Sequence, residues 1–323
     1  MTQVVFLDFG STSHGDLDLT RLQAVCGHLQ LWPHTHTQQR LQHIGRAEVI
    51  ISNKVMLDAQ LLASVRDHVK LICIAATGTN NVDLHAAQKF SIPVTNIRNY
   101  AAQSVAEHSI ALLFALARQI TAYQQTVQRG DWQRSPHFCL LDYPITELAG
   151  KTFGIIGYGG LGQATARLAR ALGMHVLIAE RPEASQLRLG RVSLDELFSR
   201  ADVVSLHCPL TSQTHHLVNA ARLRQMKPTA FLLNTARGGL VNETDLLAAL
   251  QNGTIAGAAL DVLPIEPPPA DSPLLQQPLP NLIITPHIAW ASRTARQTLL
   301  DQLADIIGQW QQGTLLNPVL PSI

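Results

Sequence analysis

The stretch Thr152-Phe153-Gly154-Ile155-Ile156-Gly157-Tyr158-Gly159-Gly160-Leu161-Gly162 decides the fold of this 323-residue chain. Its apolar part, residues 153–156, predicts a strand that is buried in a parallel sheet. Glycines then follow at the spacing Gly-x-Gly-x-x-Gly, and a helical pattern begins directly after the last of them. A strand, a glycine-rich turn and a helix in this order are typical of proteins that bind dinucleotides.

Each glycine of this turn has its own physical role. Gly157 permits the tight turn, Gly159 lets the backbone approach a pyrophosphate, and Gly162 lets the helix and the strand pack closely. Backbone N–H groups at the start of the helix, around Gly160 and Leu161, then face the phosphates. Because any glycine-rich turn can produce this spacing, the alternative is a purely structural turn in another kind of α/β protein.

The segment after the turn favours the cofactor site. Gly173 ends the predicted helix, residues 174–179 form a second apolar strand, and Glu180 stands at its end. An acidic residue about 20 positions beyond the glycines is where a ribose 2′-hydroxyl needs an acceptor, so Glu180 predicts NAD as the cofactor. The neighbouring Arg181 could offset the repulsion between Glu180 and a 2′-phosphate, which keeps NADP open as an alternative.

Composition and charge argue against several classes of partner. A hydrophobic fraction of 46% and a charged fraction of 15% describe an ordinary globular chain, and its length suggests about two domains. The formal net charge of +1 argues against nucleic acid or an anionic membrane as a partner. The longest apolar stretch, residues 109–117, is too short to span a bilayer, and the first residues lack a basic signal region. We expect a soluble protein.

The cysteines and histidines indicate a reducing compartment and no metal centre. Four cysteines are scattered without a disulfide framework, at Cys26, Cys73, Cys139 and Cys208. They predict reduced thiols and a cytoplasmic location. None of the 14 histidines forms a pair with metal-ligand spacing on an obvious helix, so we expect no metal site.

Strand and helix signals alternate in two parts of the chain. In residues 1 to about 100, strands are predicted at 4–7, 49–52, 71–75 and 92–94, with helices at 58–67 and 84–90. From residue 151 to about 286, later strands at 203–206, 230–233, 256–260 and 282–284 alternate with helices at 194–200, 219–226 and 243–251. Both parts therefore predict α/β units with parallel sheets.

Two longer helices complete the prediction. Residues 103–128 form one helical pattern rich in Ala and Leu, and its apolar character exceeds what one buried face needs. We expect this helix to pack against a second subunit as well as against its own domain. Residues 292–312 predict a final amphipathic helix.

Three charged or titratable residues each lie just past a predicted strand of the second part. They are Arg237, Glu266 and His287. Because the carboxyl ends of parallel strands meet at one edge of a sheet, the three could lie together. Arginine would hold a carboxylate and the adjacent carbonyl, histidine would transfer a proton, and the glutamate would orient the ring, which suits proton-coupled hydride transfer. Taken singly, each residue also has a purely structural explanation.

Several motifs resemble those of the D-isomer-specific 2-hydroxyacid dehydrogenases. The glycine turn, continued by Ala166 and Gly173, resembles the NAD signature of this family. Further similar motifs are residues 207–211 (HCPLT), 234–241 (NTARGGLV), 259–262 (ALDV), 266–267 (EP) and 285–290 (TPHIAW). Within the family, residues 103–108 and 285–292 look most like the bacterial glycerate dehydrogenases, which reduce hydroxypyruvate and often glyoxylate.

The resemblance implies two Rossmann-like or flavodoxin-like α/β domains, with the NAD-binding domain inserted into a discontinuous substrate domain. The substrate-binding domain would comprise residues 1–100 and 288–323, and the NAD-binding domain residues 101–287. The long helix after the first hinge would form a homodimer interface.

The resemblance also implies roles for individual residues. Catalysis would fall to Arg237, Glu266 and His287, and the first and last of these would contact the substrate together with the backbone of Thr77 and Gly78. Beyond the glycine turn and Glu180, the implied cofactor contacts are Asp261, which would hold the nicotinamide carboxamide, and Pro209, Thr235 and Ala236 within the similar motifs.

The expected function is NAD(H)-dependent reduction of small 2-oxo acids, with His287 as proton donor. Hydroxypyruvate would give D-glycerate, and glyoxylate would give glycolate. Alternatives within the family are D-3-phosphoglycerate and D-lactate dehydrogenase; the regulatory domain of long phosphoglycerate enzymes is not expected here. An NAD-sensing, corepressor-like binding protein is the alternative from another class, because such proteins share the fold and keep the three residues.

Overall fold

The computed structural model describes residues 2–276 and 278–321. The chain forms two compact units, one of Met1–Ala101 with Ala291–Ile323 and one of Ala102–Trp290, named here unit 1 and unit 2. Each is built on its own sheet, in which every pair of neighbouring strands is parallel. The predicted α/β architecture is confirmed.

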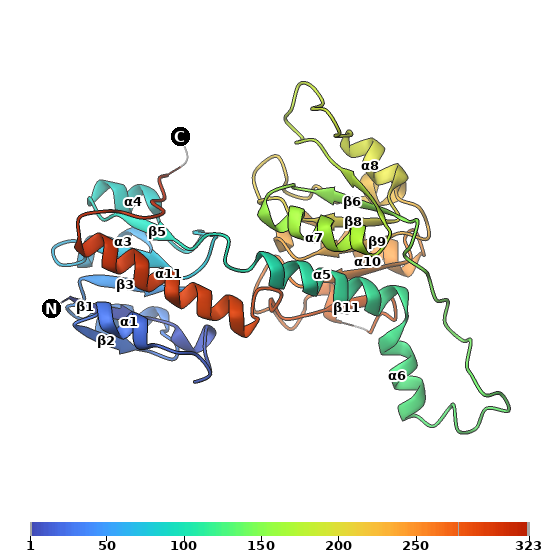
Figure 1. The fold of residues 1–323 in the computed structure, drawn as a ribbon, viewed down its shortest axis with the longest axis horizontal. Coiled ribbons are helices and arrows are strands. Elements are labelled where there is room, and N and C mark those ends of the chain that lie inside the picture. Colours follow the sequence, from blue (N-terminus) through green and yellow to red (C-terminus); the bar gives the residue numbers. More distant parts are fainter. Residues whose placement is uncertain (1, 277, 322–323) are drawn as a thin grey trace. The chain divides into compact units, whose positions relative to one another are not determined.

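Unit 1 contains a five-stranded sheet in the order β2-β1-β3-β4-β5 (Figure 1). Its strands are β1 (Gln3–Phe6), β2 (His28–Leu31), β3 (Val49–Ser52), β4 (Leu71–Ile74) and β5 (Val94–Asn96). Its helices are α1 (Thr20–Val25), α2 (Arg40–Ile44), α3 (Ala59–Val65), α4 (Leu84–Lys89) and α11 (Arg293–Gln311). Every residue of β3 and β4 is buried, as expected for central strands covered on both faces.

Unit 2 contains a six-stranded sheet in the order β11-β10-β9-β8-β6-β7 (Figure 1). Its strands are β6 (Thr152–Ile156), β7 (His175–Ile178), β8 (Val203–Leu206), β9 (Phe231–Asn234), β10 (Gly257–Leu260) and β11 (Leu282–Ile284). Its helices are α5 (Ala102–Ala117), α6 (Ile120–Gln128), α7 (Gly160–Ala171), α8 (Leu194–Arg200), α9 (Ala220–Gln225) and α10 (Glu243–Gln251). Short 3-10 turns occupy Gly238–Leu240 and Pro273–Leu275.

The strand order of unit 2 places a topological switch beside the glycine turn. From β6 the chain moves outward to β7, and it then crosses back to β8 on the other side of β6. Beyond β7, a single parallel bridge between Ala179 and Val192 stands where a doubly wound nucleotide-binding sheet has its third strand. Ligands bind at such switch points, outside the carboxyl ends of the strands.

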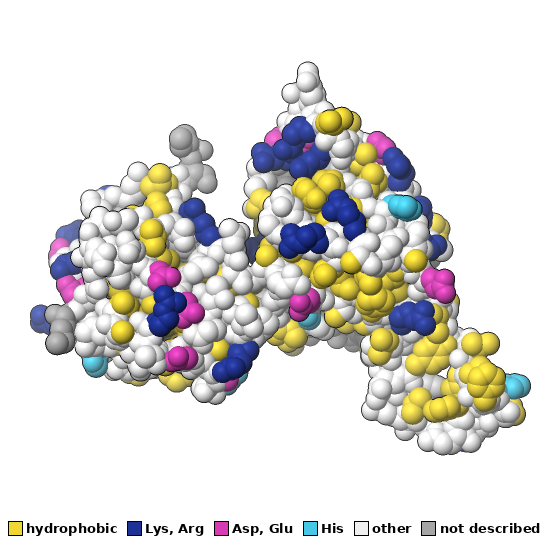
Figure 2. Space-filling model, viewed as in Figure 1, with side chains coloured by type: hydrophobic (Ala, Val, Ile, Leu, Met, Phe, Trp, Pro, Cys, Tyr) yellow, Lys and Arg dark blue, Asp and Glu magenta, His cyan; other side chains and the backbone are white. Residues whose placement is uncertain are grey.

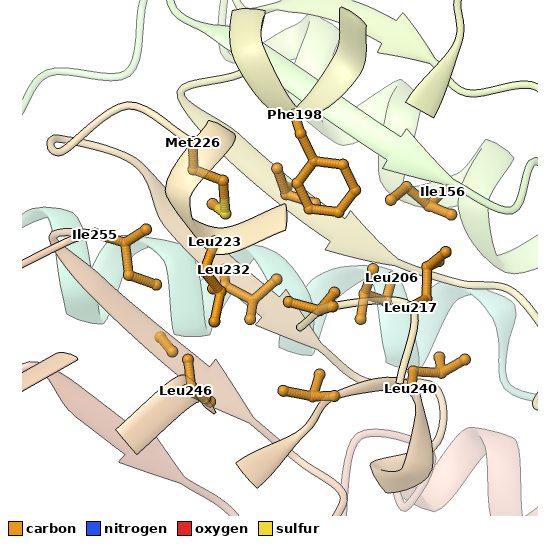
Figure 3. Close-up of a cluster of buried hydrophobic side chains, with 14 of the residues drawn as sticks. Ile156, Phe198, Leu206, Leu217, Leu223, Met226, Leu232, Leu240, Leu246 and Ile255 are labelled. Atoms are coloured by element: carbon orange, nitrogen blue, oxygen red, sulfur yellow. The ribbon is translucent and has the colours of Figure 1, made fainter. Parts of the chain in front are cut away.

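Helices cover both faces of the sheet in unit 2. On one face, α8, α9 and α10 bury a cluster that includes Ile156, Phe198, Leu223 and Leu246 (Figure 3). On the other face, α5 and α7 pack on the sheet through residues such as Leu113 and Ala166. Helices α8, α9 and α10 begin at Ser193, Asn219 and Asn242, whose side chains accept hydrogen bonds from backbone N–H groups of the first turn. This core holds the strand ends in place.

The structure corrects the prediction of one helix over residues 103–128. The chain forms two helices, α5 and α6, because Gln119 takes a left-handed conformation with φ of 53°. The carbonyl of Ala117 accepts a hydrogen bond from the Thr146 N–H instead of continuing the helical ladder. The short elements β2, α1 and α2 were not predicted from the sequence. Among the described residues, no helix is long and apolar enough to cross a membrane.

Candidate active site

The glycine turn connects β6 to α7 in unit 2. Gly157 has φ of 95°, and a Cβ there would lie 2.5 Å from the carbonyl carbon of His207 and from the nitrogen of Cys208. A Cβ on Gly162 would lie 2.1 Å from the carbonyl oxygen of Gly157. The fold itself therefore requires glycine at both positions. Gly159 differs, because a Cβ there would have no protein atom within 4 Å, so the space beside it is open to a ligand.

The start of α7 presents backbone N–H groups at this open space. Gly159 is the N-cap residue and brings no side chain that could satisfy them. Gly160 and Leu161 begin the helix, so their N–H groups belong to the first turn. An uncapped N-terminus beside a glycine without steric neighbours suits the pyrophosphate of a dinucleotide.

The segment after β8 packs against the glycine turn. The backbone N–H of His207 donates to the carbonyl of Ile156, and the His207 ring lies 2.9 Å from the Ser205 hydroxyl. Burial lowers the pKa of His207 to about 4, so the ring is neutral near pH 7 and acts as a packing group. Pro209 follows, and its carbonyl accepts a hydrogen bond from Thr214.

Arg237 lies in a loop after β9 that is stabilised by hydrogen bonds of the Asn234 side chain. The Asn234 side chain donates to the Arg237 carbonyl at 2.9 Å and accepts from the Ala236 N–H at 3.1 Å. The Thr235 hydroxyl lies 3.0 Å from that of Ser109 on α5. The Arg237 guanidinium donates to the Ala236 carbonyl at 2.7 Å. Sequence analysis did not assign a role to Asn234, although the residue stands inside the motif that contains Arg237.

Gly238 brings this loop against the segment that follows β10. A Cβ at Gly238 would lie 1.9 Å from the Leu263 carbonyl carbon, so only glycine fits. Three residues beyond Leu263, the Glu266 carboxylate accepts the Leu263 N–H at 2.9 Å. The loop that carries Arg237 and the loop that carries Glu266 are therefore in contact.

Glu266 and His287 form a direct pair. Glu266 Oε2 lies 2.6 Å from His287 Nδ1, and both side chains are about a third exposed or less. Because Nδ1 is engaged by the carboxylate, Nε2 is the ring nitrogen that can exchange a proton with a substrate. His287 has φ of 54°, a left-handed conformation that a side chain rarely adopts. Its backbone is held by a hydrogen bond from its N–H to the Asp261 carbonyl at 2.8 Å.

Asp261 fixes the segment that bears His287. Its buried carboxylate accepts hydrogen bonds from the Thr285 hydroxyl at 2.6 Å and from the N–H groups of Ile288 and Ala289 at 2.9 and 2.8 Å. His108 on α5 lies 3.0 Å from the Thr285 hydroxyl and 3.5 Å from the carboxylate. Burial raises the pKa of Asp261, but the hydrogen bonds from His108, Thr285 and the backbone outweigh it and lower the pKa overall. Sequence analysis assigned no role to His108.

Glu180 stands at the end of β7, buried beneath the exposed loop of residues 181–190. Its carboxylate receives the N–H groups of Arg181 and Arg188 and two guanidinium N–H groups of Arg188. The Arg188 guanidinium, aided by these N–H groups, holds the pKa of Glu180 well below its usual range. Sequence analysis did not identify Arg188.

Most of the predicted site residues lie in unit 2. The glycine turn follows β6, Glu180 follows β7, Pro209 follows β8, and Arg237, Glu266 and His287 follow the adjacent strands β9, β10 and β11. Thr77 and Gly78 lie in unit 1, between β4 and α4. There the Thr77 hydroxyl donates to the Ile97 carbonyl, and its carbonyl accepts from the Asn96 side chain. No cluster of metal-ligating side chains occurs among residues 2–276 and 278–321.

The glycine turn, the bare helix start and the strand-end residues together fit a nicotinamide dinucleotide. Residues 110–289 match the family description "D-isomer specific 2-hydroxyacid dehydrogenase, NAD binding domain". The chain belongs to this family of NAD-dependent oxidoreductases, as its motifs predicted.

Individual relatives narrow the comparison. The chain is 47% identical over 288 residues to a glycerate dehydrogenase of Methylorubrum extorquens, covering 89% of each chain. It is 38% identical over 322 residues to a hydroxypyruvate reductase of Blautia hydrogenotrophica, covering 98% of this chain and 99% of the relative. Both are named for the oxidation of a 2-hydroxy acid or the reverse reduction.

Solved structures agree on the fold. A protein from Thermus thermophilus superposes with a TM-score of 0.85 at 35% identity, over 98% of this chain and 99% of that one. An acyclic imino acid reductase, solved in complex with NADPH and D-arginine, superposes with a TM-score of 0.84 at 26% identity, over 98% and 100% of the two chains.

Proposed function

We propose that this enzyme reduces hydroxypyruvate to D-glycerate and glyoxylate to glycolate, with NADH as the reductant and His287 as the proton donor. The observation that carries the mechanism is the 2.6 Å contact between Glu266 and His287 Nδ1, at the sheet edge that also bears Arg237 and the glycine turn. The glycerate dehydrogenase and hydroxypyruvate reductase relatives support the choice of substrate.

When bound, the nicotinamide cofactor supplies the hydride that C2 of the 2-oxo acid accepts. Arg237 holds the substrate carboxylate and carbonyl through its planar fork of N–H groups. His287 Nε2 gives its proton to the carbonyl oxygen, which becomes the hydroxyl of the product. Glu266 keeps the ring oriented through Nδ1 and stabilises the charged ring before transfer. In the oxidative direction the same nitrogen takes the hydroxyl proton.

The remaining contacts of the ligands follow from the same proposal. The start of α7 and the glycine turn hold the pyrophosphate, and the residues around Pro209, Thr235 and Ala236 line the cofactor. Asp261 is expected to serve the nicotinamide carboxamide, and its hydrogen bonds to the segment of residues 285–289 support a second role in positioning His287. Thr77 and Gly78 are expected to contribute backbone N–H groups to the substrate carboxylate, which makes residues 1–100 and 288–323 the substrate-binding domain and residues 101–287 the NAD-binding domain.

A substrate panel tests the proposed function. The rate of NADH oxidation is measured with hydroxypyruvate, glyoxylate, pyruvate and 3-phosphohydroxypyruvate, and the configuration of the product is determined. We expect the highest kcat/KM with hydroxypyruvate or glyoxylate. A higher value with pyruvate or with the phosphorylated acid would replace the proposed substrate. Tight NADH binding without turnover of any of the four would favour an NAD-sensing binding protein.

We also propose that the protein is a homodimer in a reducing, cytoplasmic compartment. The arm formed by α6 and the segment that follows it extends from unit 2 and carries exposed apolar side chains (Figures 1 and 2). Phe138 is 90% exposed and Leu141 is 84% exposed, which favours a partner that covers them. All four cysteines are free thiols, which supports the compartment.

Sedimentation of the wild type and of a Phe138→Asp, Leu141→Asp double variant tests the dimer. We expect a dimeric wild type and a monomeric variant, and a monomeric wild type would contradict the proposal.

A further inference from the structure

Arg188 places a guanidinium group against the carboxylate of Glu180 in the candidate cofactor site. A free glutamate at the end of β7 accepts ribose hydroxyls and repels a 2′-phosphate, which selects NAD against NADP. Here the Glu180 carboxylate is not free. Arg188 Nε lies 2.8 Å from Oε2 and Arg188 Nη2 lies 2.5 Å from Oε1, while the N–H groups of Arg181 and Arg188 add two more hydrogen bonds.

These four hydrogen bonds occupy the carboxylate. An ionised carboxylate offers about four lone-pair positions, so a ribose hydroxyl could bind Glu180 only by displacing one of the present donors. The bidentate contact also cancels the negative charge that would repel a phosphate. Glu180 therefore serves to hold Arg188 in place.

The Arg188 guanidinium still has donors to offer. It carries five N–H groups, and its contacts with Glu180 use only two of them. Its side chain is 53% exposed, so the remaining edge faces solvent. A phosphate can therefore bind Arg188 without breaking the pair with Glu180.

Two further arginines lie close to Glu180 and Arg188 in the sequence. Arg181 is exposed directly after Glu180. Arg191 donates to the carbonyl of Ala179, and its guanidinium lies 5.4 Å from the ring centroid of Tyr158, between the first two glycines of the turn. This contact ties the basic loop to the cofactor turn. Figure 2 shows several Lys and Arg side chains gathered at this end of unit 2. Three arginines against Glu180 and Glu183 leave the segment 180–191 with a net positive charge.

We propose that Arg188, held by Glu180 and assisted by Arg181, forms a binding site for the 2′-phosphate of NADPH, so that the enzyme accepts both reduced cofactors. The inference rests on the proposed function only in taking the glycine turn as the cofactor site. Arg188 is the residue that determines the cofactor preference. It places a positive charge where Glu180 alone would repel the 2′-phosphate of NADPH.

The test uses adenosine 2′,5′-bisphosphate and 5′-AMP, which differ only in the 2′-phosphate. Their dissociation constants are measured by calorimetry for the full-length protein without substrate. We expect the wild type to bind the bisphosphate at least as tightly as 5′-AMP. In Arg188→Gln the bisphosphate should bind about tenfold or more weakly, because a charge-assisted contact is lost and Glu180 is exposed. The same variant should bind 5′-AMP no more weakly than the wild type does.

Two variants complete the design. Glu180→Gln loosens the hold on Arg188 and should weaken binding of the bisphosphate, but less than Arg188→Gln does, because the guanidinium itself remains. Arg200→Gln is the matched control, because Arg200 also pairs with a glutamate and is 58% exposed, but lies at the end of α8. It should leave both constants unchanged.

A wild type that binds 5′-AMP more tightly than the bisphosphate would overturn the inference, as would an unchanged ratio of the two constants in Arg188→Gln. Because no substrate is present, these outcomes are independent of the 2-oxo acid panel. Absence of turnover in that panel would remove the proposed function and leave the phosphate site standing.

Discussion

Two glutamates at one edge of the sheet in unit 2 hold basic side chains in different ways. Glu266 contacts His287 through a single oxygen, and its partner is a ring that can lose and regain a proton. Glu180 contacts Arg188 through both oxygens, and its partner keeps its charge at every accessible pH. The first pair is suited to moving a proton, and the second is suited to holding a fixed charge near the cofactor.

The largest effect is expected from removing the ring of the first pair. His287→Ala should lower kcat for hydroxypyruvate reduction by about a hundred- to ten-thousand-fold, because the variant lacks the proposed proton donor. NADH binding, followed by its fluorescence, should stay close to that of the wild type. Near-normal turnover would remove His287 from the mechanism.

Matched substitutions of the two glutamates sharpen the comparison. Glu266→Gln should lower kcat about tenfold or more in both directions, because a charge-assisted hydrogen bond to His287 becomes a neutral one. Glu180→Gln removes the same charge from the second pair and should change the preference between NADPH and NADH, with kcat for hydroxypyruvate retained. Steady-state kinetics with both cofactors measure this. Equal losses of kcat in the two variants would show that the pairs do not have separate roles.

Arg237 tests whether geometry or charge anchors the substrate. Arg237→Lys keeps the positive charge but loses the planar fork, so kcat/KM for hydroxypyruvate should fall about tenfold or more. Binding of NADH alone should hardly change. Wild-type kinetics in this variant would place Arg237 outside the substrate site.

The last expected effect is on stability and concerns a histidine that has no role in the proposed proton transfer. His207 is buried with its pKa lowered to about 4, whereas the unfolded chain protonates near 6.5. Stability from His207 is therefore complete above about pH 6.5 and is lost as the pH falls toward about 4. Urea unfolding at about pH 7 and about pH 4.5 should show an acid-induced loss about 2 to 3 kcal/mol larger in the wild type than in His207→Gln. Equal losses would mean that His207 is not buried as a neutral ring.

Much of the cofactor site could be predicted because its signals are local. The geometry of the glycine turn depends on three glycines that lie close together in the sequence. The carboxyl ends of parallel strands meet at one edge of a sheet, and this rule predicts that Arg237, Glu266 and His287 lie at the same edge. The contacts of Asp261 and His108 depend on the packing of α5 against the segment after β11, which sequence spacing does not reveal.

Other features escaped prediction for physical reasons. The loop from Arg181 to Gly190 is exposed and has no periodicity, so nothing in the sequence indicated that Arg188 folds back onto Glu180. The break between α5 and α6 falls at Gln119, where neither glycine nor proline marks a left-handed residue. Strand β2 was missed because this edge strand, His28–Leu31, contains only two apolar residues.

The pH dependence of the forward and reverse reactions tests the proton-transfer pair most directly. In the proposed mechanism, reduction needs the proton on His287, whereas oxidation of D-glycerate needs the ring without it. We predict that, as pH rises, kcat for hydroxypyruvate reduction falls while kcat for D-glycerate oxidation climbs over the same range, with solvent isotope effects in both directions. Rates that rise or fall together with pH would contradict a single proton carried by His287.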